Sequence, residues 1–351
     1  MFQRKAKELV GLDIGSSAIK LVELRKKGSG YELVGLAMEN LGQDTIVDGA
    51  IEDANVAAAA VGRVLAKQTT KSRNVAIAVS GHSVIVKRIS VPASNDEELH
   101  NALAYEAPQH VPFDLAEVSL SYHVLGHNPA SNAMDVLLAA AKNDKIQNYT
   151  NVVRQAGATP VVMDIDAFAL QNAYELNYQP EPNHASALLN IGASMMNINI
   201  VRDGVPLFTR DVTMGGNHYT HTLQEELNLS FEEAEKLKLG NGSSPDQSEA
   251  RIQQLHRVSE NLLLEVHKTF DFFHQTAPAE TLHAIYIAGG TARTEGLKEL
   301  LEAEFNVPVE IMNPFRQVAV NQEKLDSAFI TEAAPRMSVA VGLALRSFDA
   351  A

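Results

Sequence analysis

The sequence predicts an α/β protein of two similar lobes, with a smaller subdomain inserted into the first lobe. Strand-like apolar runs alternate with helical stretches along the chain, and turns rich in glycine and serine separate them. In addition, the segment at residues 12–17 returns in closely related form at residues 189–194, 177 positions later, each time between two strand-like runs. A repeat half a chain apart indicates two domains of the same design that face one another.

The first part of the chain is predicted to form a sheet with one helix. Apolar residues dominate or alternate in each strand-like run, and Gly-Ser clusters bound the first three runs. The predicted strands are residues 8–14, 18–25, 31–37, 74–79 and 84–89, and the predicted helix is 54–68.

From Pro92 the composition changes, which indicates an insertion. An acidic helix at 97–107 is followed by a stretch containing Pro108 and Pro112. Strands at 117–125 and 135–141 and a helix at 144–155 follow, before a strand at 160–165.

The second half is predicted to repeat the sheet and to add helices. Its predicted strands are 195–202, 205–212, 282–288 and 307–311, and its predicted helices are 217–227, 230–239, 248–274, 294–305 and 335–346. The expected limits are 1–89 with 159–186 for the first lobe core, 90–158 for the inserted subdomain, 187–214 with 282–351 for the second lobe core, and 215–281 for a helical subdomain.

Composition excludes several classes of function. There are 43 acidic and 29 basic side chains, a net charge of −14, and no Lys/Arg-rich stretch, which argues against a nucleic-acid partner. The absence of cysteine excludes disulfides, thiol nucleophiles and thiolate metal sites. We find neither a signal peptide nor an apolar run near the ~18 to 20 residues that a membrane span needs. A cytoplasmic protein without a membrane span is expected.

The repeated turns have the composition of a phosphate site. Gly15 and Gly192 let the backbone approach a ligand, successive N–H groups can point at phosphate oxygens, and serine hydroxyls add donors. The Asp13 carboxylate can orient waters of a Mg²⁺ ion, and Lys20 can neutralise phosphate charge. The alternative interpretation is two ordinary tight hairpin turns.

Each of the other motifs, taken alone, is weaker evidence for a nucleotide site. Gly289-Gly290, followed by Thr291, ends a strand where backbone N–H groups can meet a phosphate or ribose, and Gly215-Gly216 precedes a helix. Glu235 can accept from ribose hydroxyls and Lys238 can approach the base or sugar, although a solvated Glu/Lys pair is the simpler explanation. The pairs His218/His221 and His123/His127 have no third ligand at a suitable spacing. Neither a P-loop nor a Rossmann fingerprint is present.

The order and spacing of these motifs resemble the actin-like ATPases, closest to the FtsA branch. Residues 11–24, Pro108-x-x-Val111-Pro112-Phe113-Asp114 and Val162-x-Asp164-x-Asp166-x-Phe168-Ala169-Leu170 are similar to the PilM family of type IV pilus assembly. The likeness covers nearly the whole chain.

The resemblance implies an actin-like ATPase fold with ATP and Mg²⁺ between the lobes and an FtsA-like inserted subdomain. It places Asp166 where a carboxylate can orient an attacking water. The positions that match the ATP-binding motifs are Asp13, Gly15, Ser16, Ser17, Lys20, Asn190, Gly192, Ala193, Ser194, Gly215, Gly216, Glu235, Lys238, Gly289, Gly290 and Thr291. The second phosphate motif usually begins with Asp, and here Asn190 takes that place. Weak hydrolysis at most is therefore expected.

The resemblance also implies a partner. The chain would be an adaptor of type IV pilus assembly and twitching motility, with its conformation set by nucleotide. It would bind the N-terminal cytoplasmic peptide of a PilN-like membrane protein, and so lie at the inner face of the inner membrane with other pilus assembly proteins. We expect the peptide in a groove between the insertion and the first lobe, near 84–89 and 108–113. The alternatives are a small-molecule kinase with Asp166 as general base and a self-associating, filament-forming ATPase.

Overall fold

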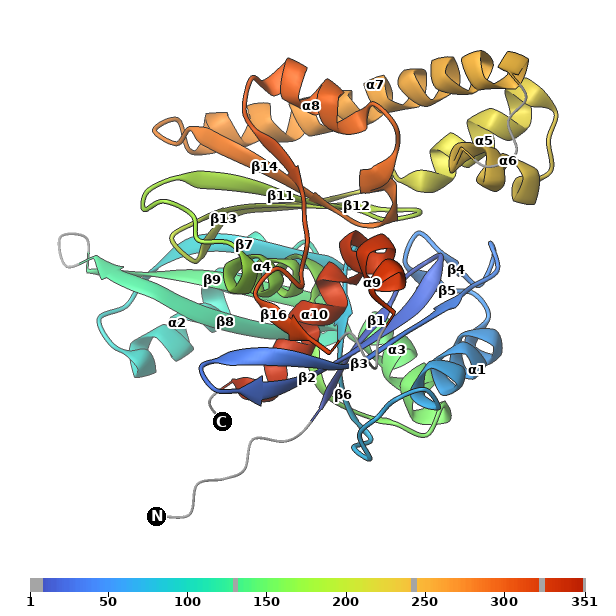
Figure 1. The fold of residues 1–351 in the computed structure, drawn as a ribbon. Coiled ribbons are helices and arrows are strands. Elements are labelled where there is room, and N and C mark those ends of the chain that lie inside the picture. Colours follow the sequence, from blue (N-terminus) through green and yellow to red (C-terminus); the bar gives the residue numbers. More distant parts are fainter. Residues whose placement is uncertain (1–8, 129–131, 241–244, 322–325, 350–351) are drawn as a thin grey trace.

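Two mixed sheets of the same topology form the centre of the molecule (Figure 1). The computed structural model describes residues 9–128, 132–240, 245–321 and 326–349. One sheet has the order β10-β6-β1-β2-β3-β16 and the other β13-β12-β11-β14-β15. The first sheet comprises β1 (Val10–Ile14), β2 (Ala18–Lys27), β3 (Gly30–Asn40), β6 (Asn74–Val79), β10 (Thr159–Ile165) and β16 (Val318–Val320). The second comprises β11 (Ala185–Ile191), β12 (Met196–Arg202), β13 (Val205–Val212), β14 (Leu282–Ala288) and β15 (Val309–Ile311).

The repeated segments occupy equivalent places in the two sheets. β1 pairs antiparallel with β2 and parallel with β6, and β11 pairs antiparallel with β12 and parallel with β14. Asp13 lies opposite Lys20 in the first hairpin, and Asn190 lies opposite Asn197 in the second. The two lobes therefore repeat one another as the sequence predicts, and equivalent residues have the same strand register in both hairpins.

One face of the first sheet is covered by α1 (Ala54–Leu65) and α3 (Asn143–Gln155). The Asp53 side chain caps α1 by accepting from the N–H groups of Asn55 and Val56. A short hairpin of β4 (Ile46–Val47) and β5 (Ala50–Ile51) precedes α1. Alanine and valine side chains of α1 and aliphatic residues of α3 bury this face against the strands.

Two helices, α4 (Asp166–Asn177) and α10 (Ser338–Leu345), join the lobes. α4 packs on β12 and β11 of the second lobe, and α10 packs on β1 and β2 of the first. Their mutual contact is very close, since a Cβ at Gly342 would lie 1.7 Å from the carbonyl oxygen of Ala169. The sequence did not predict α4, whose apolar residues are spread around the helix.

The C-terminal segment belongs to the first lobe, not to the second lobe as expected. β16 extends the first sheet beside β3, and α9 (Ser327–Ala333) and α10 bury Val22, Leu24 and Leu33. By length and composition, the helical stretch Ser327–Phe348 would be long and apolar enough to cross a membrane, which the sequence analysis overlooked. Because 67% of its most apolar window is buried inside the structure, it serves here as a core element.

A third sheet of order β7-β9-β8 forms the insertion with α2 (Asp96–His110). Its strands are β7 (Val84–Pro92), β8 (Val118–Asn128) and β9 (Ala133–Lys142). The strand expected at 84–89 in the first lobe thus pairs with β9. α3 contacts β9 but packs mainly on α1 and the first sheet, in the core of the first lobe. We propose limits of 84–142 for the inserted subdomain.

The second sheet carries its helices on the side away from the first lobe (Figure 1). They are α5 (Gly216–Leu227), α6 (Phe231–Lys238), α7 (Pro245–Thr276) and α8 (Leu297–Phe305). α6 begins with a reciprocal capping box, in which Ser230 and Glu233 bond each other's backbone N–H groups.

Candidate functional site

The two repeated turns meet between the lobes. Ser16 Oγ and Ser194 Oγ are 2.6 Å apart, although 178 positions separate them in the sequence. Each turn joins the two strands of its own hairpin, so each is held by an extended sheet. The repeat therefore brings two glycine-serine turns face to face.

On the first-lobe side the turn carries an ion pair. Lys20 Nζ lies 2.8 Å from Asp13 Oδ2, and both side chains are only 12% exposed. A Cβ at Gly15 would lie 3.0 Å from Lys20 Nζ, so glycine leaves room for the ammonium group beside the turn. The pair offers one acidic and one basic group next to Ser16.

On the second-lobe side the turn packs against two other glycine motifs. The Gly192 carbonyl oxygen accepts from the Gly216 N–H at 2.9 Å and from Thr291 Oγ1 at 2.8 Å. A Cβ at Gly215 would lie 2.5 Å from that oxygen, and one at Gly289 would lie 2.2 Å from the Ile191 oxygen. Only glycine permits these approaches.

The residues assigned to the adenosine side also come together. Lys238 Nζ lies 2.6 Å from Glu235 Oε2 and donates to the Gly216 carbonyl oxygen at 3.3 Å. Burial lowers the pKa of Lys238, and the charge of Glu235 opposes this. Gly290 faces the Arg336 side chain, whose Nε would lie 3.8 Å from a Cβ there.

Three carboxylates from both lobes, Asp13, Asp166 and Asp211, are called here the acidic cluster, because the charges of Asp13 and Asp211 act on Asp166. Asp166 is the first residue of α4, directly after β10. Its pKa is raised to about 7, first by burial and then by the charges of Asp13 and Asp211, against a hydrogen bond from Ser80 and the charge of Lys145. A partly buried carboxyl group with a pKa raised this far is typical of functional sites.

Three charged residues of this region were missed by the sequence analysis: Lys145, Asp211 and Arg336. Burial raises the pKa of Asp211, which accepts from Asn197 Nδ2 and from the Gly81 N–H. Burial lowers the pKa of Lys145, and the charges of Asp166 and Asp211 oppose that effect. The sequence could have indicated Asp211, because it stands four residues before Gly215. Lys145 and Arg336 belong to no local motif.

The histidine pairs do not gather ligands. His218 Nδ1 accepts from the Gly215 N–H at the start of α5, and His221 lies 3.1 Å from the Gln224 side chain. Among the residues that the structure describes, no three His, Cys, Asp or Glu side chains are placed to hold a metal ion directly. The carboxylate of Asp13 beside the glycine turn suits a magnesium ion held through its waters.

A cavity of about 240 Å³ adjoins the acidic cluster. It is lined by the start of β7, by Ile165 and Ala167 around the start of α4, and by residues 209–211 of β13. Gly81 and His82 also line it, and His82 Nε2 lies 3.0 Å from Thr213 Oγ1. The stretch 108–113, expected as a groove wall, is not among the lining residues.

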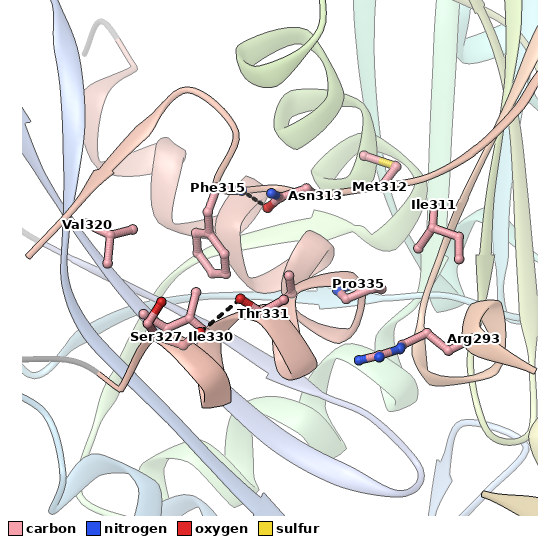
Figure 2. A pocket seen from close by; sticks show the side chains of 11 residues that line it. Arg293, Ile311, Met312, Asn313, Phe315, Val320, Ser327, Ile330, Thr331 and Pro335 are labelled. Carbon is pink, nitrogen blue, oxygen red and sulfur yellow. Dashed lines mark hydrogen bonds between the residues drawn. The ribbon is translucent and has the colours of Figure 1, made fainter. Parts of the chain in front are cut away.

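A second cavity, of about 380 Å³, lies between the end of β15 and α9 (Figure 2). Its lining is mainly apolar, with Arg293, Asn313, Ser327 and Thr331 as polar members. None of the residues proposed from the sequence lines it, so we do not assign the site there.

Known proteins share this architecture. A family model described as type IV pilus assembly protein PilM matches residues 11–348. The cell division protein FtsA of Helicobacter pylori is 24% identical over 276 residues, which are 72% of this chain and 53% of FtsA. The chain thus spans about half the length of that relative.

Solved structures agree with the family match. A chain of the PilM-PilN type IV pilus biogenesis complex is 28% identical with a TM-score of 0.87, covering 98% of this chain and 100% of that one. The ethanolamine utilization protein EutJ from Carboxydothermus hydrogenoformans is 18% identical with a TM-score of 0.57, covering 96% and 89%, and shows the fold alone. The predicted actin-like fold is confirmed, and the chain belongs to the PilM family of type IV pilus assembly proteins.

Proposed function

We propose that this chain is an ATP-binding adaptor that recruits a PilN-like membrane protein through that protein's N-terminal cytoplasmic peptide, with nucleotide setting the adaptor's conformation. The contact between Ser16 and Ser194 carries the nucleotide part of the proposal. It joins the two turns that lie on separate lobes, so a ligand held by both turns controls how the lobes sit against each other.

The residues around the turns fit such a ligand. The Gly15 and Gly192 N–H groups close their own turns by donating to the Ala18 and Met195 carbonyl oxygens. The hydroxyls of the turn serines and the N–H groups at residues 16, 17, 193 and 194 are the proposed donors to phosphates, and Lys20 neutralises the phosphate charge. Asp13 would hold a Mg²⁺ ion through the ion's waters, and the ion would supply positive charge to the phosphates. The adenosine side is assigned to Gly215, Gly216, Glu235, Lys238, Gly289, Gly290 and Thr291.

Asp166 is the proposed catalytic residue of a weak ATPase. A carboxyl group with a pKa of about 7 is ionised in part of the molecules at neutral pH and can accept a proton from water. Asn190 supplies no negative charge at the second turn, so the expected turnover lies well below the roughly 1 to 10³ per second of typical enzymes. The rate of ATP turnover is measured as the phosphate that the purified protein releases.

The peptide part rests on the cavity along β7. Val84, Ile85 and Val86 give it an apolar wall next to the first lobe, and Asp211 lies at its second-lobe side. A site built from both lobes changes shape when they move, which links peptide affinity to nucleotide. The match to a PilM-PilN complex supports a PilN-like partner. Such a partner would hold the adaptor at the inner face of the inner membrane.

The nucleotide assignment is tested by identifying, by mass spectrometry, nucleotide that co-purifies with the protein, followed by calorimetric titration with Mg-ATP. Adenine nucleotide in the purified protein and saturable binding support it. The absence of both would refute it.

The partner assignment is tested by fluorescence anisotropy with a labelled peptide from the N-terminus of a PilN-like protein. Val86→Arg puts a charge into the cavity wall and should weaken binding about tenfold or more, since an unpaired charge beside an apolar ligand is costly. Ser90→Arg, at an exposed position of the same strand, is the matched control. Equal affinities for the two variants would exclude this groove.

A further inference from the structure

The second hairpin replaces a charged pair by a neutral one. Positions 190 and 197 repeat positions 13 and 20, and both pairs face each other across their hairpins. In the first lobe the pair is Asp13 with Lys20. In the second lobe, Asn190 Nδ2 donates to Asn197 Oδ1 at 2.9 Å.

The second lobe nevertheless holds a carboxylate, one strand further on. Asn197 lies opposite Asp211 of β13, and its Nδ2 donates to Asp211 Oδ1 at 2.8 Å. The corresponding residue of the first lobe, opposite Lys20 on β3, is Met38. The other oxygen of Asp211 accepts from the Gly81 N–H of the first lobe.

The hydrogen bonds determine how the side-chain amides of Asn190 and Asn197 are oriented. An ionised carboxylate only accepts, so Asn197 must turn its amide hydrogens toward Asp211 and its oxygen toward Asn190. Asn190 must then present its own amide group as the donor. An aspartate at 190 would face the Asn197 oxygen with a second acceptor, so the amide at 190 follows from the acid at 211.

We propose that Asp211 supplies to the bound Mg-nucleotide the second-lobe negative charge that Asn190 lacks. This inference rests on the proposed nucleotide site and deepens it. Asp211 is joined through Asn197 to Asn190 in the strand that leads into the second turn, and its other oxygen accepts from the Gly81 N–H of the first lobe, so its charge lies at the junction of the two lobes. Asp13 is the carboxylate of the first lobe, so a hydrated divalent cation at the lobe junction would have one carboxylate available from each lobe, and magnesium is usually bound through one or two carboxylates.

The hydrogen-bond chain provides variants that move the charge without cutting the network. In Asp211→Asn, rotation of the Asn197 and Asn190 amides by half a turn restores each bond while removing the charge. In the double variant Asn190→Asp with Asp211→Asn, the same rotation at Asn197 lets residue 190 accept and residue 211 donate, so the charge returns to position 190. Asn190→Asp alone leaves two carboxylates competing for one amide.

The experiment compares ATP affinity with Mg²⁺ and with EDTA, by fluorescence of a mant-labelled ATP, in full-length protein. We expect Mg²⁺ to tighten binding about tenfold or more in the wild type, as for a charged group that gains a hydrogen-bonded partner. Asp211→Asn should lose most of this factor while keeping its affinity in EDTA, and the double variant should recover it. Asp271→Asn, exposed on α7, is the control.

The outcomes separate the two levels of the proposal. A wild type that does not bind ATP refutes the proposed nucleotide site itself. If ATP binds and Asp211→Asn keeps the full Mg²⁺ factor, Asp211 does not serve the nucleotide, and a changed peptide affinity would then assign it to the β7 cavity. If Asp211→Asn does not fold, a double variant that folds but lacks the Mg²⁺ factor overturns the inference equally.

Discussion

Replacing Asp166 by asparagine tests the electrostatics of the acidic cluster. Burial and the charges of Asp13 and Asp211 raise the pKa of Asp166 from 3.8 to about 7 in the folded protein. Between these values the folded protein holds a proton that the unfolded chain has released. Folding therefore takes up a proton, and the contribution of Asp166 to stability falls as pH rises from about 4 to about 7, then stays constant.

The magnitude follows from how far the pKa rises. One pKa unit corresponds to about 1.4 kcal/mol, so the rise to about 7 sets an upper limit of about 4 kcal/mol on the destabilisation at pH 8. An asparagine side chain at this position has the shape of protonated aspartate at every pH and can still accept the hydrogen bond from Ser80. We expect Asp166→Asn to match the wild type near pH 4 and to be more stable by up to about 4 kcal/mol at pH 8.

The assay is urea unfolding of both proteins at several pH values from 4 to 8 without nucleotide. Asp164 and Asp211, whose pKa values burial also raises, are present in both proteins. The difference curve therefore reports the titration of Asp166 together with its coupling to Asp13 and Asp211. Asp271→Asn, exposed on α7, should give a flat difference curve. Parallel stability curves for the wild type and Asp166→Asn would show that Asp166 is not held protonated, and the reasoning would fail.

Three further predictions follow from the lobe contacts. Asp13→Ala should weaken Mg-ATP binding by about 1 to 3 kcal/mol in calorimetry, because a group that bonds a charged partner is lost; unchanged affinity would refute the role of Asp13. Gly342→Ala should destabilise the protein by about 3 kcal/mol or more in urea, since its Cβ would lie 1.7 Å from the Ala169 oxygen. Gly62→Ala in α1, where a Cβ meets nothing within 4 Å, should instead stabilise by about 0.5 to 1 kcal/mol; similar effects would argue against the close helix contact. Because the Lys142 N–H donates to the Ser83 carbonyl oxygen, the ends of the insertion lie close enough for a short Gly-Ser linker to replace residues 84–141. This variant should still bind ATP and should lose its affinity for the peptide in fluorescence anisotropy. Unchanged peptide affinity would exclude the proposed groove.

Local patterns in the sequence determined much of the architecture. Apolar alternation and glycine-serine turns placed β6, β13 and β14 at their observed limits, because strand periodicity and turn chemistry are properties of neighbouring residues. The repeat at residues 12–17 and 189–194 predicted the duplicated lobes. The contact of the two repeated turns at Ser16 and Ser194 agrees with this symmetry.

Other features depended on which segments pack together far along the chain. The strand at 84–89 was identifiable, but its partner, β9, was set by the pairing of the insertion. The C-terminal helices join the first lobe because their small residues fit against β1 and α4, a match of surfaces that no local pattern shows.

The sequence by itself determined the two turns and the residues that flank them, since these are encoded within a few positions. Only the tertiary structure decided that Asp211 stands beside Asn197, that Lys145 reaches the acidic cluster and that Arg336 faces Gly290. The reason is physical: cross-strand register and helix packing bring these side chains together from separate elements, and burial between the lobes then gives their charges an influence that they would not have in water.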